Sequence, residues 1–140
     1  MGVAETNLTG VLEEGNALRG KGALEAAADQ YRRVLVQDPA HADSLYFLAQ
    51  ISCQQGHVSN GIGLVRKALA ADPQHGRAHN LLGMALNALG QPAEARASFD
   101  AAIRCQPELA TAHGGRGDVL AALGRHTEAI ASYDRALEID

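Results

Sequence analysis

Large aromatic side chains are scarce in this sequence. Its 140 residues include no tryptophan, two phenylalanines and three tyrosines. Because aromatic rings supply much of the buried area of an ordinary globular core, alanine and leucine must provide most of the packing here. The composition therefore argues against a core built around a few large rings.

Positive charge is also in short supply. Lysine and arginine number 12 against 16 for aspartate and glutamate, which gives a formal net charge of -4 with neutral histidines. General binding to nucleic acid or to an anionic membrane depends on a surplus of positive charge, so we expect neither partner. No apolar run is long enough to cross a bilayer, and the first residues lack the charged and apolar regions of a secretory signal.

Cysteine occurs only twice, at Cys53 and Cys105. The spacing of these residues matches no metal-binding pattern, and we interpret both as free thiols in a reducing compartment. This interpretation predicts a cytoplasmic location.

A pattern of glycine, proline and apolar residues repeats along the sequence with a period of 34 residues. Glycines suited to a short turn between two helices recur at this interval, at Gly22, Gly56, Gly90 and Gly124. Prolines that would end the second helix of each pair recur in the same register, at Pro39, Pro73 and Pro107. Repetition at this length is typical of stacked helical hairpins that bury their apolar faces against one another.

The same register holds matched small and large side chains. The expected second helices carry a large residue at one repeated place, Tyr31, Val65, Phe99 and Tyr133, four residues after a small one. A spacing of four places both on one helical face. The expected first helices carry a small residue at their own repeated place, Gly15, Ala49, Gly83 and Gly117. Small residues allow two helices to approach closely, and the large side chain fills the gap between them.

These features resemble the tetratricopeptide repeat family, whose pattern includes a glycine, an alanine, an aromatic residue, a second alanine and a closing proline. The resemblance covers four units, residues 8–41, 42–75, 76–109 and 110–140. It implies an all-α fold, a right-handed solenoid of four helix-turn-helix repeats with about eight helices and no β-sheet. Residues 1–140 are expected to form a single domain.

The last repeat lacks its closing proline and a polar capping helix. Because solenoid ends need a cap to stay soluble, we expect one of two arrangements. Either the chain is a piece of a longer protein, or a partner covers the flank of the last helix pair. A second copy of the chain is one candidate for that partner, which would make a homo-oligomer.

Two local departures from the pattern lead to further expectations for the helices. The first helix should span about residues 8–19, with Glu14 on a face that no preceding repeat covers. In the helix over residues 58–71, Gly61 has a packing role and Gly63 has none, so this helix should be the least protected interior one.

In the fourth repeat, Arg116 stands where leucine is expected. We expect its side chain to reach water or to pair with a carboxylate such as Asp118 or a neighbouring glutamate.

No catalytic, cofactor-binding or metal-binding residues are apparent. The serines lie in no nucleophile elbow, and neither cysteine has the context of a nucleophile. His75 and His79 are four residues apart, but no third ligand follows at metal spacing. His79 and His113 occupy the same place in their repeats, which indicates a structural role. We therefore expect no enzymatic activity and no cofactor.

The resemblance also implies a binding surface, because the first helices of successive repeats line a concave groove in this family. We expect a non-enzymatic scaffold that binds a peptide segment or partner helix of another protein in this groove. Its amide side chains suit the backbone of an extended peptide, since they both donate and accept hydrogen bonds. The predicted contact residues are Asn16, Arg19, Asp43, Tyr46, Gln50, Arg77, Asn80, Met84, Asn87 and Asp118.

An alternative hypothesis comes from a narrower resemblance. The segment over residues 41–45 and the alanine-histidine pairs ending at His79 and His113 are similar to repeats of O-GlcNAc transferases. The chain would then be the N-terminal substrate-recruiting region of a larger enzyme, such as a bacterial O-GlcNAc transferase-like glycosyltransferase. However, the place of the asparagine ladder in that group holds Glu13, Phe47, Leu81 and Gly115. The carboxylate clamp of chaperone-binding members is matched only at Asn16, with Leu12 in place of a lysine.

Overall fold

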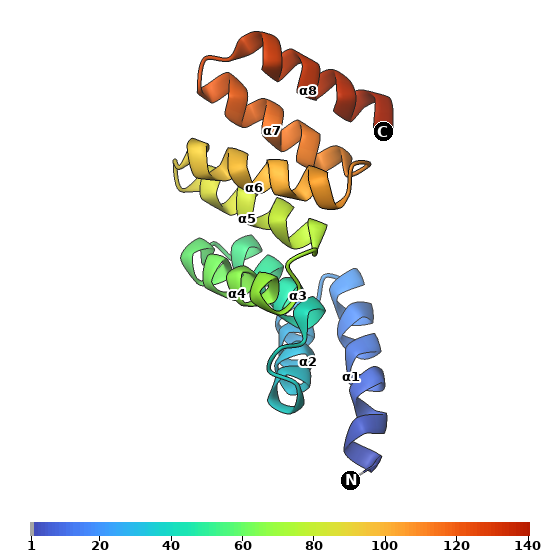
Figure 1. The fold of residues 1–140 in the computed structure, drawn as a ribbon. Helices are drawn as coiled ribbons and strands as arrows, with labels where there is room; N and C mark the ends of the chain where they lie inside the picture. Colours follow the sequence, from blue (N-terminus) through green and yellow to red (C-terminus); the bar gives the residue numbers. More distant parts are fainter. Residues whose placement is uncertain (1) are drawn as a thin grey trace. The chain divides into compact units, whose positions relative to one another are not determined.

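The computed structural model describes residues 2–140, with side chains from Leu8 onward. This part of the chain forms eight α-helices and no strand (Figure 1). The helices are α1 (Gly2–Gly20), α2 (Leu24–Gln37), α3 (Ala42–Gln54), α4 (Val58–Ala71), α5 (Gly76–Ala88), α6 (Pro92–Cys105), α7 (Ala110–Ala122) and α8 (His126–Ile139). The expected all-α fold of paired helices is confirmed.

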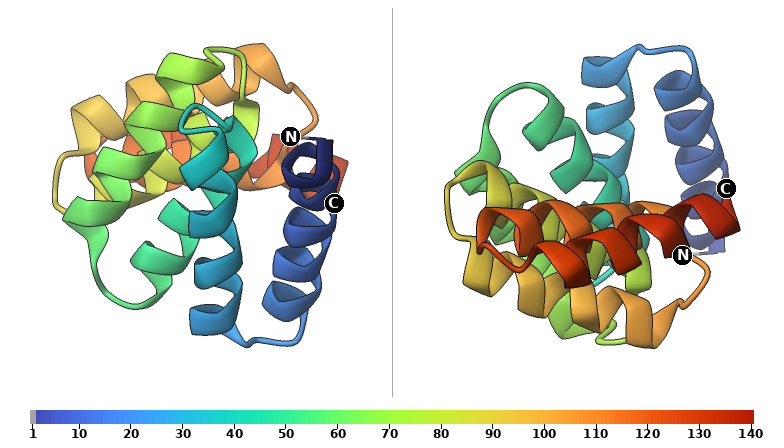
Figure 2. Two further views of the ribbon diagram at one scale, coloured as in Figure 1. Left: turned by 90° about the horizontal axis from the view of Figure 1, so that it is seen from below. Right: turned by 90° about the horizontal axis from the view of Figure 1, so that it is seen from above.

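The helices belong to two compact units, Met1–Ala71 with α1 to α4 and Asp72–Asp140 with α5 to α8. In the first unit α2 packs against α1 and α3, and α3 packs against α4. In the second unit α6 contacts both α5 and α7, α7 packs on α8, and α5 also contacts α7. The two helices of each hairpin run antiparallel (Figure 2). Each unit thus contains two hairpins that cover one another's apolar faces.

Each hairpin turn ends its first helix in the same way. The repeated glycines all have positive φ angles of 79, 86, 75 and 78°, at Gly22, Gly56, Gly90 and Gly124. In the first turn the Gly22 amide donates to the Arg19 carbonyl at 3.0 Å, and the Ala23 amide donates to the Leu18 carbonyl at 2.9 Å. The same two bonds recur in the other three turns. They define a Schellman motif, which requires a left-handed residue and explains the glycine at each turn.

The start of α1 differs from the prediction. The helix begins at Gly2 instead of near residue 8, so its first turns precede the repeat pattern. Residues 3–7 contain neither proline nor glycine, so nothing in the local sequence stops the helix from extending toward the N-terminus. Glu14 is exposed, as expected for the first helix of the array.

The small residues of the first helices lie against the large residues of the second. A Cβ added to Gly15 would lie 3.2 Å from the ring of Tyr31, and one added to Gly117 would lie 2.7 Å from the ring of Tyr133. A Cβ at Gly117 would therefore collide with the ring, and one at Gly15 would require the ring to shift by a few tenths of an ångström. The small and large places of the sequence pattern therefore correspond to direct contacts within each hairpin.

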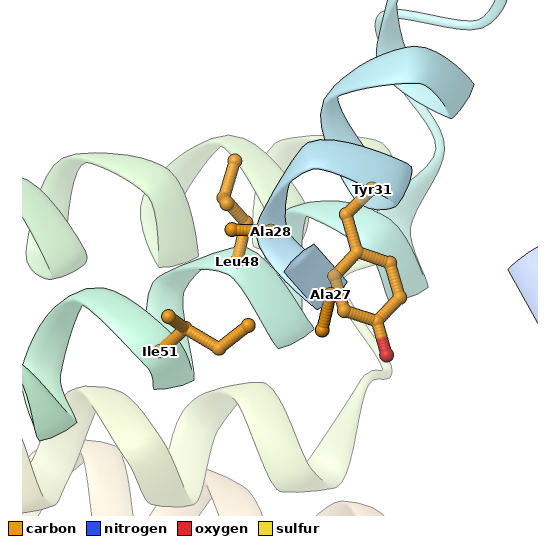
Figure 3. Close-up of a cluster of buried hydrophobic side chains, with 5 residues drawn as sticks. All are labelled: Ala27, Ala28, Tyr31, Leu48 and Ile51. Atoms are coloured by element: carbon orange, nitrogen blue, oxygen red, sulfur yellow. The ribbon is translucent and has the colours of Figure 1, made fainter. Parts of the chain in front are cut away.

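The core of the first unit continues from one hairpin to the next. Figure 3 shows Ala27 and Tyr31 of α2 near Leu48 and Ile51 of α3, all of them buried. The alanine is fully covered, and its small side chain allows α3 to lie close to α2. Leucine, isoleucine and alanine thus provide most of this packing, together with the ring of Tyr31.

The links between hairpins contain caps that the sequence analysis did not anticipate. His41 Nδ1 accepts a hydrogen bond from the Ser44 amide at 3.2 Å, and His75 Nδ1 accepts one from the Ala78 amide at 3.1 Å. These histidines are the N-caps of α3 and α5. The equivalent residue at α7 is Leu109, whose side chain makes no cap hydrogen bond. Two of the three links therefore satisfy a free helix amide with a side chain.

Candidate functional site

In the first unit, two predicted contact residues of α1 are held by a tyrosine of α2. The Tyr31 hydroxyl donates to Asn16 Oδ1 at 2.7 Å, and Arg19 Nε donates to the same hydroxyl at 3.1 Å. Tyr31 itself is fully buried. Asn16 and Arg19 therefore satisfy the one polar atom of a buried ring, which is a structural role independent of any ligand.

Arg19 also takes part in an aromatic cluster formed by α2 and α3. Its guanidinium carbon lies 4.2 Å from the centre of the Phe47 ring. Phe47 stacks on Tyr31 with 5.3 Å between centroids and meets Tyr46 at 5.1 Å. A cation over an aromatic face contributes about 0.5–1 kcal/mol at an accessible site. The predicted contact residue Tyr46 is thus mostly buried in this cluster.

The other two predicted residues of the first unit lie on α3 as well. Asp43 is exposed and Gln50 is half-buried. The face that α1 and α3 present therefore combines an arginine, aromatic edges and an amide.

In the second unit, Asn80 is the most distinctive of the predicted residues. Only 9% of it is exposed. Asn80 Nδ2 donates to Thr111 Oγ1 of α7 at 3.1 Å and lies 3.8 Å from Met84 Sδ. Its Oδ1 is buried and has no hydrogen-bond partner among the described residues. Asn80 therefore connects α5 to α7 and still has one unused polar atom.

Met84 lies one turn after Asn80 and is 52% exposed, which is unusual for a methionine on a packed helix. Arg77 is exposed and Asn87 is half-buried on the same helix. Neither side chain makes a hydrogen bond within the described part of the chain. The structure thus brings Asn80 and Met84 together and leaves Arg77 and Asn87 available to solvent.

Asp118 of α7 is also exposed, but its carboxylate is engaged. The Tyr133 hydroxyl donates to Asp118 Oδ1 at 2.6 Å. This hydrogen bond, with lesser effects of burial and of the negative charge, raises the pKa of Tyr133 above its usual value of 10.0. Asn16 and Asp118 occupy equivalent places in the first and fourth repeats, and each accepts a hydrogen bond from the tyrosine 15 residues later.

The pairing of Arg116 differs from the specific partner expected. Arg116 does pair with a carboxylate, but its Nε lies 2.7 Å from Asp100 Oδ1 on α6, and Asp118 instead binds Tyr133. Arg116 Nη1 also donates to Ser132 Oγ of α8 at 2.8 Å. Asp100 lies 16 residues before Arg116, so only the contact between α6 and α7 brings them together.

The recurrent histidines have the structural role that their register indicated. The ring Nε2 atoms of His79 and His113 each lie 2.9 Å from the carbonyl oxygen of the proline six residues earlier, Pro73 and Pro107. Across the described residues, no three histidine, cysteine, aspartate or glutamate side chains are grouped so as to hold a metal ion. Within the same part of the chain, no helix combines the length and hydrophobicity needed to span a membrane.

A family model described as tetratricopeptide repeat matches residues 12–74, 53–110 and 88–140. These overlapping matches cover most of the sequence and include all eight helices at least in part. The chain belongs to the tetratricopeptide repeat family. A comparison with curated protein sequences gave no match.

Solved tetratricopeptide repeat structures resemble the chain closely in fold. A crystal structure of MamA aligns with 95% of this chain and 78% of its own, at a TM-score of 0.84 and 21% identity. A second MamA structure, labelled AMB-1, aligns with 98% of this chain and 81% of its own, at a TM-score of 0.74 and 26% identity. TTC0263, a thermophilic tetratricopeptide repeat protein from Thermus thermophilus, aligns with 95% of this chain and 74% of its own, at a TM-score of 0.83 and 27% identity.

Proposed function

We propose that this chain is a non-enzymatic interaction scaffold that binds an extended peptide segment of a partner protein on the first-helix faces of its repeats. Repeat proteins of this kind present successive helices as a binding surface, and the tetratricopeptide repeat fold supports that role. The observation that carries the proposal for this chain is the unpaired amide oxygen of Asn80 near the exposed Met84.

A buried polar atom without a hydrogen bond costs about 1–3 kcal/mol. Asn80 uses Nδ2 to donate a hydrogen bond to Thr111 and leaves Oδ1 without a partner. If the amide were turned over, Oδ1 would take the place beside Thr111 and Nδ2 would be the unused atom. A peptide N–H group that reaches Oδ1 would recover the lost free energy, and with the amide turned over a peptide C=O group would do so by accepting from Nδ2. Asn80 is therefore suited to recognise peptide backbone.

Met84 provides a second element of recognition. Its side chain has three rotatable bonds and adapts to irregular apolar partners, and its sulfur lies next to the Asn80 amide. Its exposed thioether can pack on the apolar part of a bound segment that reaches the Asn80 amide. Arg77 and Asn87 lie on the same helix with no hydrogen bond from their side chains within the described residues.

Binding of purified protein to an array of extended peptides tests this proposal. Peptides selected by the wild type should lose at least about tenfold in affinity for the variant Asn80→Ala combined with Met84→Ala, as expected for loss of an anchor and a buried hydrogen bond. The control is Glu94→Ala on the exposed surface of α6, which should leave affinity unchanged. Equal binding by the double variant would show that the α5 face is not the site.

We also propose a reducing, cytoplasmic location, which rests on the two thiols. Cys53 and Cys105 are free and half-buried. Burial raises the pKa of the Cys53 thiol, which keeps it protonated and unreactive at neutral pH.

A further inference from the structure

A hollow of about 360 Å³ lies between α6 and α7 in the second unit. Its lining residues are Asp100, Ile103, Arg104, His113 and Arg116. We call it the α6–α7 hollow. Four of its five lining side chains carry a charge or an imidazole, in a family whose helix junctions are normally packed with apolar residues.

The first unit contains the same junction, two repeats earlier, between α2 and α3. The residues 68 positions before the lining of the α6–α7 hollow are Arg32, Leu35, Val36, Leu45 and Leu48. Leu45 and Leu48 are both buried there. His113 and Arg116 replace these two leucines, and both are only half-buried. The polar junction is therefore particular to the second unit and is not demanded by the fold.

The Arg116 guanidinium is held in place from both sides. Asp100 Oδ1 on α6 lies 2.7 Å from Arg116 Nε, and Ser132 Oγ on α8 lies 2.8 Å from Arg116 Nη1. Arg96 Nε lies 3.7 Å from the other oxygen of Asp100. The single negative charge of the hollow is thus shared by two guanidinium groups, and it fixes the orientation of Arg116 without neutralising the site.

Arg104, one turn after Asp100, has no hydrogen bond or ion pair among the described residues and is exposed. Glu108, as near to Arg104 along the chain as Asp100 is, is engaged by Arg135 Nη2 at 3.1 Å. The lining of the hollow therefore contains two arginines and one aspartate, an excess of one positive charge with neutral His113, in a chain whose formal net charge is -4. The hollow is a basic site on an acidic protein.

We propose that the α6–α7 hollow binds an anionic oxygen group, a carboxylate or phosphate, presented by a side chain of a partner peptide. Arginine forks bind such groups with paired N–H donors, and Arg104 and Arg116 have donors that the protein leaves unused. The fixed Arg116 is preorganised for this contact, whereas Arg104 is free to close on the ligand.

This site is separate from the peptide surface proposed for α5 and α7. Arg116 lies two positions before Asp118, and His113 lies two positions after Thr111. At about 100° per residue, each residue of the hollow is turned about 160° around α7 from its counterpart on the peptide surface. The two proposals can therefore fail independently, because the variants that test one do not touch the other face.

Titration followed by the NMR signals of the arginine Nε–H groups tests the α6–α7 hollow. The probes are a capped hexaglutamate peptide, a capped phosphoserine peptide, inorganic phosphate and, as a neutral control, a capped hexaglutamine peptide. We expect saturable shifts of the Arg104 and Arg116 signals with the two anionic peptides and none with hexaglutamine. Saturation by inorganic phosphate alone at the affinity of the peptides would show that the site recognises a free anion, which would overturn the peptide proposal.

Two variants sharpen this test. Arg104→Gln should weaken binding of the anionic peptides about tenfold, and Arg66→Gln, an equal change of charge on an exposed position of α4, should weaken it less than about twofold. Equal effects of the two variants would overturn the proposal, because binding would then depend only on net charge.

Arg116→Leu restores the residue found at the equivalent places Leu48 and Leu82, so this variant should keep its helical circular dichroism. It should lose binding of both anionic peptides. Unchanged binding would overturn the proposal. If this variant does not fold, the comparison of Arg104→Gln with Arg66→Gln still decides, since both residues are exposed.

Discussion

The ring of Phe99 on α6 lies directly against the backbone of Gly83 on α5. A Cβ added to Gly83 would stand 2.8 Å from Cε1 and 2.9 Å from Cδ1 of the ring. The two residues lie on the two helices of one hairpin, and glycine faces an aromatic ring in the same way in the first and fourth repeats. Where the large residue is the smaller Val65, the facing place holds Ala49. The sizes of the two side chains are thus matched within each hairpin.

Gly83→Ala should destabilise the protein, because the buried ring of Phe99 cannot move away without disturbing α7 as well. Overpacking of this kind costs about 1–3 kcal/mol in free energy of unfolding. Urea unfolding followed by circular dichroism measures the change. Gly114→Ala is the control, since a Cβ at Gly114 would meet nothing within 4 Å and should stabilise α7 by about 0.5–1 kcal/mol. A neutral Gly83→Ala would mean that the hairpin packs more loosely than the structure shows.

The two glycines inside α4 should respond in opposite directions to the same substitution. A Cβ on Gly61 would collide with Cys53 Sγ and lie 3.1 Å from the Ala49 carbonyl oxygen, so Gly61→Ala should destabilise. Gly63 has open space around it, so Gly63→Ala should stabilise by about 0.4–1 kcal/mol. Thermal unfolding of both variants checks the signs. Hydrogen exchange of α4 amides should also slow in Gly63→Ala, and a faster exchange would contradict the assignment.

A side-chain cap at α7 should stabilise the second unit. Leu109 is the N-cap of this helix and makes no side-chain hydrogen bond, unlike His41 and His75 at the equivalent places. Leu109→Asn should add about 1 kcal/mol to the free energy of unfolding by accepting a hydrogen bond from a free amide of the first turn. Leu109→Ala serves as the comparison because it removes the same apolar contact without providing a cap. Equal stability of the two variants would count against a capping effect.

The hydrogen bond between Tyr133 and Asp118 predicts a dependence of stability on alkaline pH. Since the pKa of Tyr133 is raised in the folded protein, the folded state keeps a proton that the unfolded chain would release. The stabilisation is complete below the ordinary pKa of 10.0 and is lost as pH rises through the folded value. Titration of Tyr133 followed by the ultraviolet absorption of its phenolate measures the raised pKa on which this dependence rests. Asp118→Asn should lower the pKa of Tyr133, and Tyr133→Phe should remove the corresponding step.

Most of the architecture could be predicted because its causes are local. A Schellman turn requires a residue with positive φ, so the glycine interval marks every hairpin turn directly. The close approach of two helices requires a small residue opposite a large one, so Gly61 could be distinguished from Gly63 without coordinates. The further resemblance to O-GlcNAc transferase repeats and the homo-oligomer through the last helix pair stay predictions.

The candidate sites were less accessible from sequence, because they depend on which side chains meet across helices. Periodicity placed Asn16, Asn80 and Asp118 on first helices but could not show that Tyr31 and Tyr133 bind two of them. The register did single out Arg116, although its partner Asp100 could not be identified. The same comparison of repeats, extended to Arg104 and His113, could have found the α6–α7 hollow.

The sequence by itself determined the helical hairpins, their turns and the pairing of small with large residues, since backbone conformation and side-chain volume repeat every 34 positions. Tertiary structure alone decided which polar groups are used and which are spare. Hydrogen bonds and ion pairs between neighbouring helices depend on differences of a few tenths of an ångström in atomic positions, and no spacing along the chain encodes those positions. The unused atom of Asn80 and the unpaired Arg104 became visible only once the helices were packed.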